Sequence, residues 1–119
     1  MAKILIVDDA AFMRMSIQQM VEHKEHTVVG QAMDGEEAVE KFASLKPDVV
    51  LMDITMPKMD GVEALKQIKA MDPKAKVIIC SAFGQQSMIT KAIECGAETF
   101  IVKPFVEEQL LAAIDKVMQ

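Results

Sequence analysis

The chain alternates short, continuous apolar runs with longer segments in which apolar residues recur every three or four positions. Short runs of this kind predict strands that are buried on both faces, whereas the longer spacing predicts amphipathic helices. The pattern predicts strands at residues 3–7, 27–32, 49–53, 76–80 and 99–102, of which 27–32 is the least apolar and suits a sheet edge. It predicts helices that begin at residue 11, lie between residues 34 and 47 and between 60 and 72, and cover 85–95 and 106–118.

Acidic residues and prolines mark several of the predicted helix ends. Asp34 and Asp60 each precede a glutamate by three residues, which is typical of a helix N-cap. Pro47 and the pair Asp72-Pro73 would end the second and third helices, because proline cannot continue a helix. The residues expected to face the core are Met13, Ile17, Met20 and Val21, then Ala38, Phe42 and Leu45, Leu65 and Ile68, and Leu110, Ile114 and Val117.

Strict alternation of strands and helices predicts a doubly wound α/β fold of the (βα)5 type. Its crossovers are right-handed, and the five strands form a parallel sheet with helices on both faces. Residues 1–119 contain no internal repeat, linker or low-complexity segment, so we expect a single domain. Ligands of such sheets bind at the carboxyl ends of the strands.

Polar side chains stand at the carboxyl ends of four of the predicted strands. Asp8 and Asp9 follow the first strand, and Asp53 ends the third. Ser81 follows the fourth strand, and Lys103 follows the fifth. A carboxylate carried by a buried strand is unfavourable unless a cation, a metal ion or hydrogen-bond donors pair with it. We therefore expect these four strand ends to form one site.

The residue types at this site suit a magnesium ion and a phosphoryl group. Asp8, Asp9 and Asp53 would repel one another unless a cation lies among them, and Mg²⁺ prefers carboxylate oxygens and water. Lys103 suits phosphate, and with Ser81 the set could hold a phosphoryl group on an aspartate. Simpler interpretations are helix capping by the Asp8-Asp9 pair, a salt bridge from Lys103 to Asp53 or Asp9, and a turn contact of Ser81.

Composition narrows the function classes. The net charge is −5 and the pI is about 5.0, so no basic face for nucleic acid is expected. No apolar run approaches the roughly 20 residues of a membrane helix, and no signal peptide begins the chain. Cys80 and Cys95 have no metal-binding or CxxC spacing, which favours reduced thiols and a cytoplasmic location. His23 and His26 lie at the far end of the first predicted helix and are expected to be solvated, not to bind a metal ion.

The same residues carry a resemblance to a known family. The motifs, in chain order, are Val7-Asp8-Asp9, Met52-Asp53-Ile54-Thr55-Met56-Pro57, Asp60-Gly61, Ser81-Ala82 and Phe100-Ile101-Val102-Lys103-Pro104-Phe105. Together they resemble the receiver domain of two-component response regulators, and the resemblance spans the whole chain. It implies the strand order 2-1-3-4-5, which is already known for chemotaxis receivers.

The resemblance also implies residue roles. Asp53 would accept a phosphoryl group from the phosphohistidine of a sensor histidine kinase. Asp9, Asp53 and the backbone carbonyl of Thr55 would bind Mg²⁺ directly, and Asp8 would act mainly through water. Ser81 would hydrogen-bond the phosphoryl group.

In the family, Lys103 would form an ion pair with the phosphoryl group, and its bond to Pro104 is typically cis. Phe100 would be the switching aromatic residue. Because Phe100 has no hydroxyl, we expect a signal to come from burying or exposing its ring.

Two further segments, residues 10–14 and 80–86, most resemble the stand-alone chemotaxis receivers. The chain ends with the fifth predicted helix, so we expect it to signal by docking, with the flagellar motor switch protein and a phosphatase as partners. Helix 85–95 carries two apolar stripes, Met88/Ala92/Cys95 and Ile89/Ile93, and both could lie in the core. If one stripe is surplus, the resemblance points to Ile89 and Ile93 as a partner surface.

Phe12 and Met15 lie off the inward stripe of the first predicted helix, and we expect them to pack rather than to contact a partner.

A Mg²⁺-dependent phosphohydrolase that forms an aspartyl phosphate is the main alternative function, but Thr55 stands where such enzymes carry a second aspartate. The others are a phosphorelay intermediate and the receiver half of a DNA-binding regulator.

Overall fold

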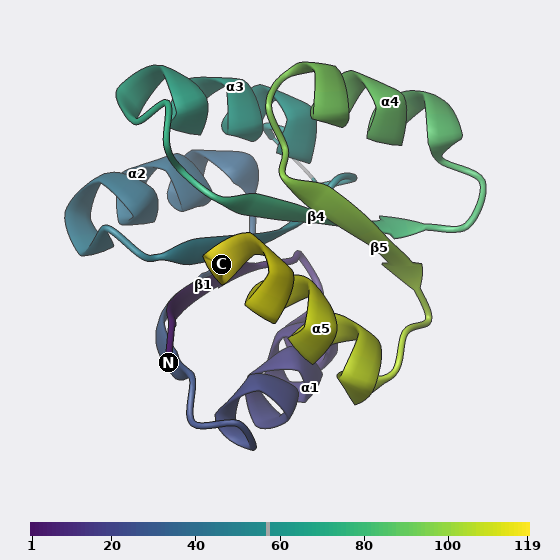
Figure 1. Ribbon diagram of the computed structural model, residues 1–119. Coiled ribbons are helices and arrows are strands. Elements are labelled where there is room, and N and C mark those ends of the chain that lie inside the picture. Colours follow the sequence, from purple (N-terminus) through teal and green to yellow (C-terminus); the bar gives the residue numbers. More distant parts are fainter. Residues whose placement is uncertain (57) are drawn as a thin grey trace.

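The computed structural model describes residues 1–56 and 58–119, and it shows a sheet between two layers of helices (Figure 1). Pro57, which belongs to the second motif, lies outside the described residues. The strands are β1 (Lys3–Val7), β2 (Thr27–Ala32), β3 (Val49–Asp53), β4 (Val77–Ala82) and β5 (Thr99–Lys103). The helices are α1 (Ala11–Glu22), α2 (Gly35–Leu45), α3 (Gly61–Met71), α4 (Gln86–Glu94) and α5 (Glu107–Met118).

The five strands of the described residues form one parallel sheet in the order β2-β1-β3-β4-β5. This confirms the predicted fold class and strand order, and β2 is the edge strand that its weaker pattern indicated. Helices α1 and α5 cover one face, and α2, α3 and α4 cover the other (Figure 1). None of the helices in residues 1–56 and 58–119 is long and apolar enough to cross a membrane.

Successive residues of the inner strands feed two separate hydrophobic clusters. In β1, Leu5 and Val7 pack in the cluster under α2, α3 and α4, whereas Ile4 and Ile6 pack in the cluster under α1 and α5. A strand that is covered on both faces needs apolar residues at every position. The continuous apolar runs of the sequence are therefore explained by the two helical layers.

Two strand ends extend beyond the predicted limits. Strand β4 continues to Ala82, and β5 continues to Lys103, because the backbones of these residues pair with each other. Ser81 and Lys103 therefore lie inside strands, not after them. Side-chain polarity suggested an earlier end, but the strand end is set by backbone pairing.

Aspartates cap two helices as predicted. The Glu37 N–H donates to Asp34 Oδ1 at 2.9 Å, and the Glu63 N–H donates to Asp60 Oδ1 at 2.9 Å. Lys46 ends α2 in the left-handed conformation, with a φ of 48°.

The inward stripes are largely confirmed, but three helix residues differ from expectation. Leu45 is 36% exposed because it ends α2 and lies over Gly30 of the edge strand, at the rim of the core. Phe12 and Met15 are 77% and 61% exposed, so the prediction that they pack is wrong. Neither residue belongs to the two hydrophobic clusters of the described core.

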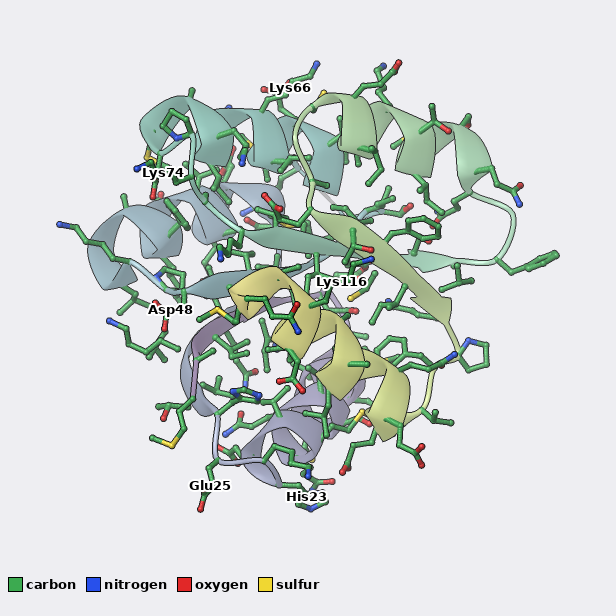
Figure 2. All side chains as sticks on the ribbon, in the orientation of Figure 1. His23, Glu25, Asp48, Lys66, Lys74 and Lys116 are labelled. Carbon is green, nitrogen blue, oxygen red and sulfur yellow. The ribbon has the colours of Figure 1, made fainter. Side chains whose placement is uncertain are left out.

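The two histidines behave differently from each other. His23 lies at the surface near the end of α1 (Figure 2), and its Nδ1 is 2.8 Å from Glu107 Oε1. His26 is buried, so the prediction that it is solvated is wrong. Its Nδ1 accepts a hydrogen bond from the Ala2 N–H at 3.0 Å, which ties the start of β1 to the start of β2.

Candidate functional site

The three predicted aspartates lie together at the carboxyl edge of the sheet. Strands β1 and β3 are neighbours, and Val7 pairs with Met52. The residues that follow this pair, Asp8 and Asp53, are therefore side by side. Asp8, Asp9 and Asp53 each offer a carboxylate oxygen, and these oxygens all lie within 4.8 Å of one another.

Lys103 reaches the same cluster from β5. Its Nζ lies 2.8 Å from Asp8 Oδ2 and 3.5 Å from Asp53 Oδ1. The expected salt bridge to Asp53 is confirmed, but its second partner is Asp8 and not Asp9. Asp8 is buried and Asp9 is exposed. The ammonium therefore pairs with the carboxylate that is shielded from water.

Asp8 also organises the turn into α1. Its Oδ1 accepts the Ala10 N–H at 2.9 Å, while its backbone carbonyl accepts Arg14 Nη1 at 2.7 Å. Ala10 occupies the N-cap position of α1, and no side chain of the described residues caps it. The helix-capping interpretation of Asp8-Asp9 is thus wrong. Asp8 holds a local turn with one oxygen and pairs with Lys103 through the other.

Burial and charge shift the protonation equilibria of the site. Burial raises the pKa of Asp53 from 3.8 to about 6; Lys103 opposes this rise, and Asp8 and Asp9 add to it. Burial lowers the pKa of Lys103, but the hydrogen bond to Asp8 and the charge of Asp53 outweigh it, so this pKa is raised. The site carries more negative charge than Lys103 neutralises.

This charge excess and the all-oxygen donor set fit a hard divalent cation. Mg²⁺ is bound in proteins by a few carboxylates and keeps several waters. Asp9 is exposed, which leaves room for those waters, whereas Asp53 is buried. Thr55 is exposed and lies two positions beyond Asp53, after the end of β3. The cluster contains no histidine or cysteine ligand that would favour zinc.

Ser81 is the least satisfied polar group at this edge. It is fully buried, and its Oγ has no hydrogen-bond partner in the part of the chain that the structure describes. The interpretation as a turn-forming serine is therefore wrong. A buried hydroxyl without a partner costs about 1–3 kcal/mol. A conformation in which the Ser81 hydroxyl finds an acceptor would therefore be favoured by that amount.

Two glycines fix the loop between β3 and α3. The Gly61 N–H donates to the Ile54 carbonyl at 2.7 Å, and the Gly35 N–H donates to the Met59 carbonyl at 3.0 Å. A Cβ on Gly61 would lie 2.3 Å from the Asp53 carbonyl oxygen. Absence of a side chain at Gly61 therefore lets the start of α3 approach the end of β3 and set the position of Asp53.

Sequence reasoning missed Gln85, which joins two loops beside the cluster. The Ala82 N–H donates to Gln85 Oε1 at 2.8 Å, and Gln85 Nε2 donates to Thr55 Oγ1 at 2.6 Å. A glutamine before a helix has no pattern that distinguishes it from a solvated one. Only the approach of the loops in space gives it these partners.

An apolar groove of about 420 Å³ lies between α4 and β5. Ile89 is mostly buried and packs in the core, but it also lines the groove. Ile93 and Phe100, which are 42% and 43% exposed, line the groove with it, as does Val102. Ile93 is the most exposed member of the second α4 stripe, and the first stripe is partly accessible through Met88. Whether this surface binds a partner stays a prediction.

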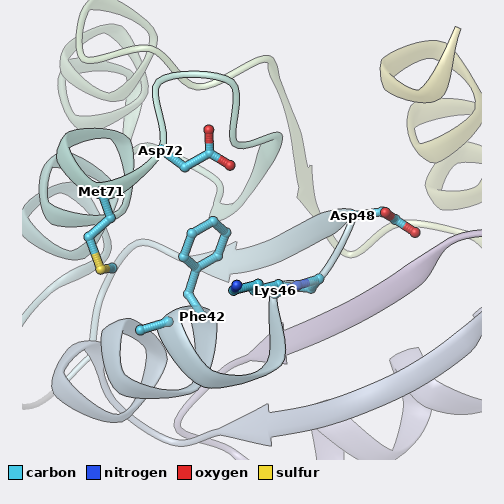
Figure 3. Close-up of a pocket in the computed structure, with 7 residues that line it drawn as sticks. Phe42, Lys46, Asp48, Met71 and Asp72 are labelled. Carbon is cyan, nitrogen blue, oxygen red and sulfur yellow. The ribbon is translucent and has the colours of Figure 1, made fainter.

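A second cleft, of about 600 Å³, lies at the other edge of the sheet (Figure 3). It is lined by Phe42 and Lys46 of the α2 end, Asp48 before β3, and Met71 and Asp72 of the α3 end. These residues meet the amino end of β3, whereas Asp53 is at its carboxyl end. The cleft is thus separate from the acidic cluster.

The fold, the acidic cluster and the cis Lys103-Pro104 bond agree with one class of protein. The chain belongs to the response regulator receiver domain family, which it matches over residues 4–115. It is 53% identical to the chemotaxis protein CheY of Thermotoga maritima over 115 residues, which are 97% of this chain and 96% of that protein. It is 56% identical to CheY of Listeria monocytogenes over 116 residues, 98% of each chain.

A solved relative has the same architecture. The CheX-CheY-BeF3-Mg complex from Borrelia burgdorferi contains a chain that superposes with a TM-score of 0.94 and 38% identity. The match covers 98% of this chain and 89% of that chain. The family resemblance inferred from the motifs is therefore confirmed.

Proposed function

We propose that this chain is a response regulator of chemotaxis that is switched on when Asp53 accepts a phosphoryl group from a sensor histidine kinase. The observation that carries the proposal is the meeting of Asp53 with Asp8, Asp9 and Lys103 at the carboxyl edge of a receiver fold. The chemotaxis relatives, identical at more than half of the aligned positions, support the pathway.

In the proposed reaction, a carboxylate oxygen of Asp53 attacks the phosphorus of the kinase phosphohistidine. The new P–O bond forms as the P–N bond breaks, and the imidazole of the kinase leaves with the electron pair. Lys103 offsets charge on the phosphoryl oxygens. Asp9, Asp53 and the Thr55 carbonyl would hold Mg²⁺, with Asp8 acting mainly through water. When bound, the ion neutralises the oxygens of the transferring group.

The phosphoryl group would become a signal through Ser81. Its unpaired hydroxyl gains an acceptor when phosphoryl oxygens appear, which favours the phosphorylated conformation. Movement of Ser81 toward the phosphoryl group would free space for the ring of Phe100. Rotation of this exposed ring would alter the groove between α4 and β5, and with it the surface that contains Ile89 and Ile93.

The proposed protein works by docking and not as a turnover enzyme. Thr55 lacks the acid/base group with which a phosphohydrolase releases its aspartyl phosphate. We infer a single receiver domain over residues 1–119, a cytoplasmic location, the flagellar motor switch protein as target, and a phosphatase as a further partner. The Borrelia relative, in complex with CheX, supports docking to separate proteins.

A pull-down with and without beryllofluoride, a phosphoryl mimic, discriminates between the candidate outputs. Capture of a flagellar switch component only in the presence of beryllofluoride supports the chemotaxis assignment. Capture of a histidine phosphotransfer protein alone would instead favour a phosphorelay intermediate.

Incubation with acetyl phosphate and Mg²⁺ is expected to add a single phosphoryl group to the wild-type chain. Intact-mass spectrometry should detect it, and EDTA should prevent it because the charge on the attacking and transferred oxygens is then not neutralised. Asp53→Asn should remain unlabelled, and labelling of that variant would reject the assignment. Steady hydrolysis of small phosphate esters would favour the phosphohydrolase.

Lys103→Ala should still accept a phosphoryl group, but phosphorylation should no longer raise its affinity for the docking partner. The reason is that Lys103 is the cation that reaches from β5 to Asp53, 3.5 Å away. Calorimetric titration of partner into phosphorylated and unphosphorylated forms measures this coupling. Lys66→Ala, at an exposed site on α3 (Figure 2), is the control and should respond like wild type. A normal phosphorylation response in Lys103→Ala would contradict the role.

A further inference from the structure

The side chain of Gln85 forms a hydrogen-bonded bridge between the end of β4 and the loop after β3. Its Oε1 accepts the Ala82 N–H at 2.8 Å, and its Nε2 donates to Thr55 Oγ1 at 2.6 Å. Ala82 directly follows Ser81, and Thr55 lies two residues after Asp53. Strands β3 and β4 are neighbours in the sheet, so Gln85 connects the end of β4 and the β4–α4 loop to the loop that follows Asp53.

The bridge holds a loop that is otherwise exposed, the one between β4 and α4. Phe83 is 87% exposed, and a Cβ built on Gly84 would meet no described atom within 4 Å. Gly84 also has a φ of +91°, a conformation that other residues rarely adopt. Packing therefore contributes little to holding this loop in place. Gln85 stands at the N-cap position of α4, but none of the described side chains caps this helix, and its carboxamide serves the bridge.

Release of the bridge would change the donors available to a phosphoryl group. An acyl phosphate on Asp53 brings new acceptor oxygens that need hydrogen-bond donors. The hydroxyl of Ser81 is already unpaired, whereas the Ala82 N–H is engaged by Gln85. The Ala82 N–H can donate to a phosphoryl oxygen only after its hydrogen bond to Gln85 Oε1 has broken.

We propose that Gln85 is a positioning residue that latches the β4–α4 loop in its unphosphorylated arrangement, and that the latch opens when Asp53 is phosphorylated. The proposal rests on the proposed function of this site and adds a residue that sets the balance between its two states. Loss of the latch should favour the phosphorylated arrangement, because one competing set of hydrogen bonds is removed from the unphosphorylated one.

The test is the affinity of the protein for beryllofluoride at saturating Mg²⁺, measured by calorimetry because the chain has no Trp or Tyr. Gln85→Ala should bind about three- to tenfold more tightly than wild type, as expected for the loss of roughly one net hydrogen bond. Gln86→Ala, which removes the adjacent exposed glutamine, is the matched control and should bind like wild type. Gln85→Asn keeps the carboxamide but is too short to span both loops, so it should resemble Gln85→Ala.

Two further readouts separate a latch from a general loosening of the loop. In the unphosphorylated protein, exchange of the Ala82 amide should accelerate in Gln85→Ala and stay unchanged in Gln86→Ala. In a Thr55→Val background, which removes the hydroxyl at the other end of the bridge, Gln85→Ala should have a smaller effect on beryllofluoride affinity.

The outcomes also separate the latch from the function on which it rests. If wild type binds beryllofluoride and Gln85→Ala binds it equally or more weakly, the latch is wrong and the proposed function stands. An unchanged exchange rate of the Ala82 amide in Gln85→Ala would also overturn the latch. If wild type does not bind beryllofluoride with Mg²⁺ at all, the proposed function fails and the latch fails with it.

Discussion

Gly61→Ala is expected to lower the free energy of unfolding by about 3 kcal/mol, near the upper end of what overpacking costs. In an unobstructed helix the same change would stabilise the protein by up to about 1 kcal/mol, because alanine has the higher helix propensity. Here the new Cβ would lie 2.3 Å from the Asp53 carbonyl oxygen and 2.8 Å from the Ile54 Cα. Both neighbours are backbone atoms, so the strain cannot be relieved by rotating a side chain.

Chemical denaturation followed by circular dichroism measures this effect, and Gly30→Ala is the matched control. Its Cβ would meet the end of the flexible Leu45 side chain at 2.6 Å, and this side chain can turn aside. Gly30→Ala should therefore cost much less than Gly61→Ala. Because Gly61 lies against the residue that carries the site, the Gly61 variant should also lose labelling by acetyl phosphate. Equal stability of the two variants would show that the backbone of β3 leaves room for a Cβ at residue 61.

The fold could be predicted because its main determinants are local and repetitive. Continuous apolar runs such as Ile4–Val7 indicate burial on both faces, and a parallel sheet between two helical layers provides it. Asp34 and Asp60 cap their helices through contacts three residues away, within reach of a sequence pattern. The sequence also predicted that the polar residues at the strand ends would form one site, because the carboxyl ends of parallel strands lie at the same edge of a sheet.

What could not be predicted depends on distances between segments. Asp8 and Asp9 are adjacent acids of the same type, and nothing in their order shows that the first is buried against Lys103 while the second is exposed. His26 is buried where the start of the chain lies beside it, and its Nδ1 accepts a hydrogen bond from the Ala2 N–H. Gln85 similarly finds one of its hydrogen-bond partners in Thr55, thirty residues away in the chain.

The exposed residues of α1 show a different limit. The helical period correctly assigned Ile17 and Val21 to the core. It could not say whether Phe12 and Met15, off that stripe, would meet a neighbouring element. Apolar character alone favoured packing, but α5 and the sheet cover only the inner part of the helix, and both residues remain exposed.

Asp53→Asn is expected to make the metal-free protein more stable at pH 7.5, by up to about 3 kcal/mol. Burial raises the pKa of Asp53 to about 6 in the folded protein, against 3.8 ordinarily. The folded state therefore holds this proton more tightly than the unfolded state does. The stability that this proton contributes is fully present below pH 3.8 and is lost as the pH rises through about 6. An uncharged asparagine of the same shape avoids the burial of charge that remains above that pH.

Denaturation in EDTA between pH 4 and 7.5 should show the two proteins converging at the acidic end and separating as the pH rises. Asp115→Asn, at an exposed position on α5, should follow wild type throughout. Added Mg²⁺ should stabilise wild type at pH 7.5 and leave Asp53→Asn nearly unchanged, so the difference in stability between the two proteins should narrow. The reason is that the Asp53 carboxylate, which destabilises the metal-free protein, is also expected to bind the ion. A constant difference between wild type and Asp53→Asn across this pH range would show that the Asp53 carboxylate is not destabilised by its burial.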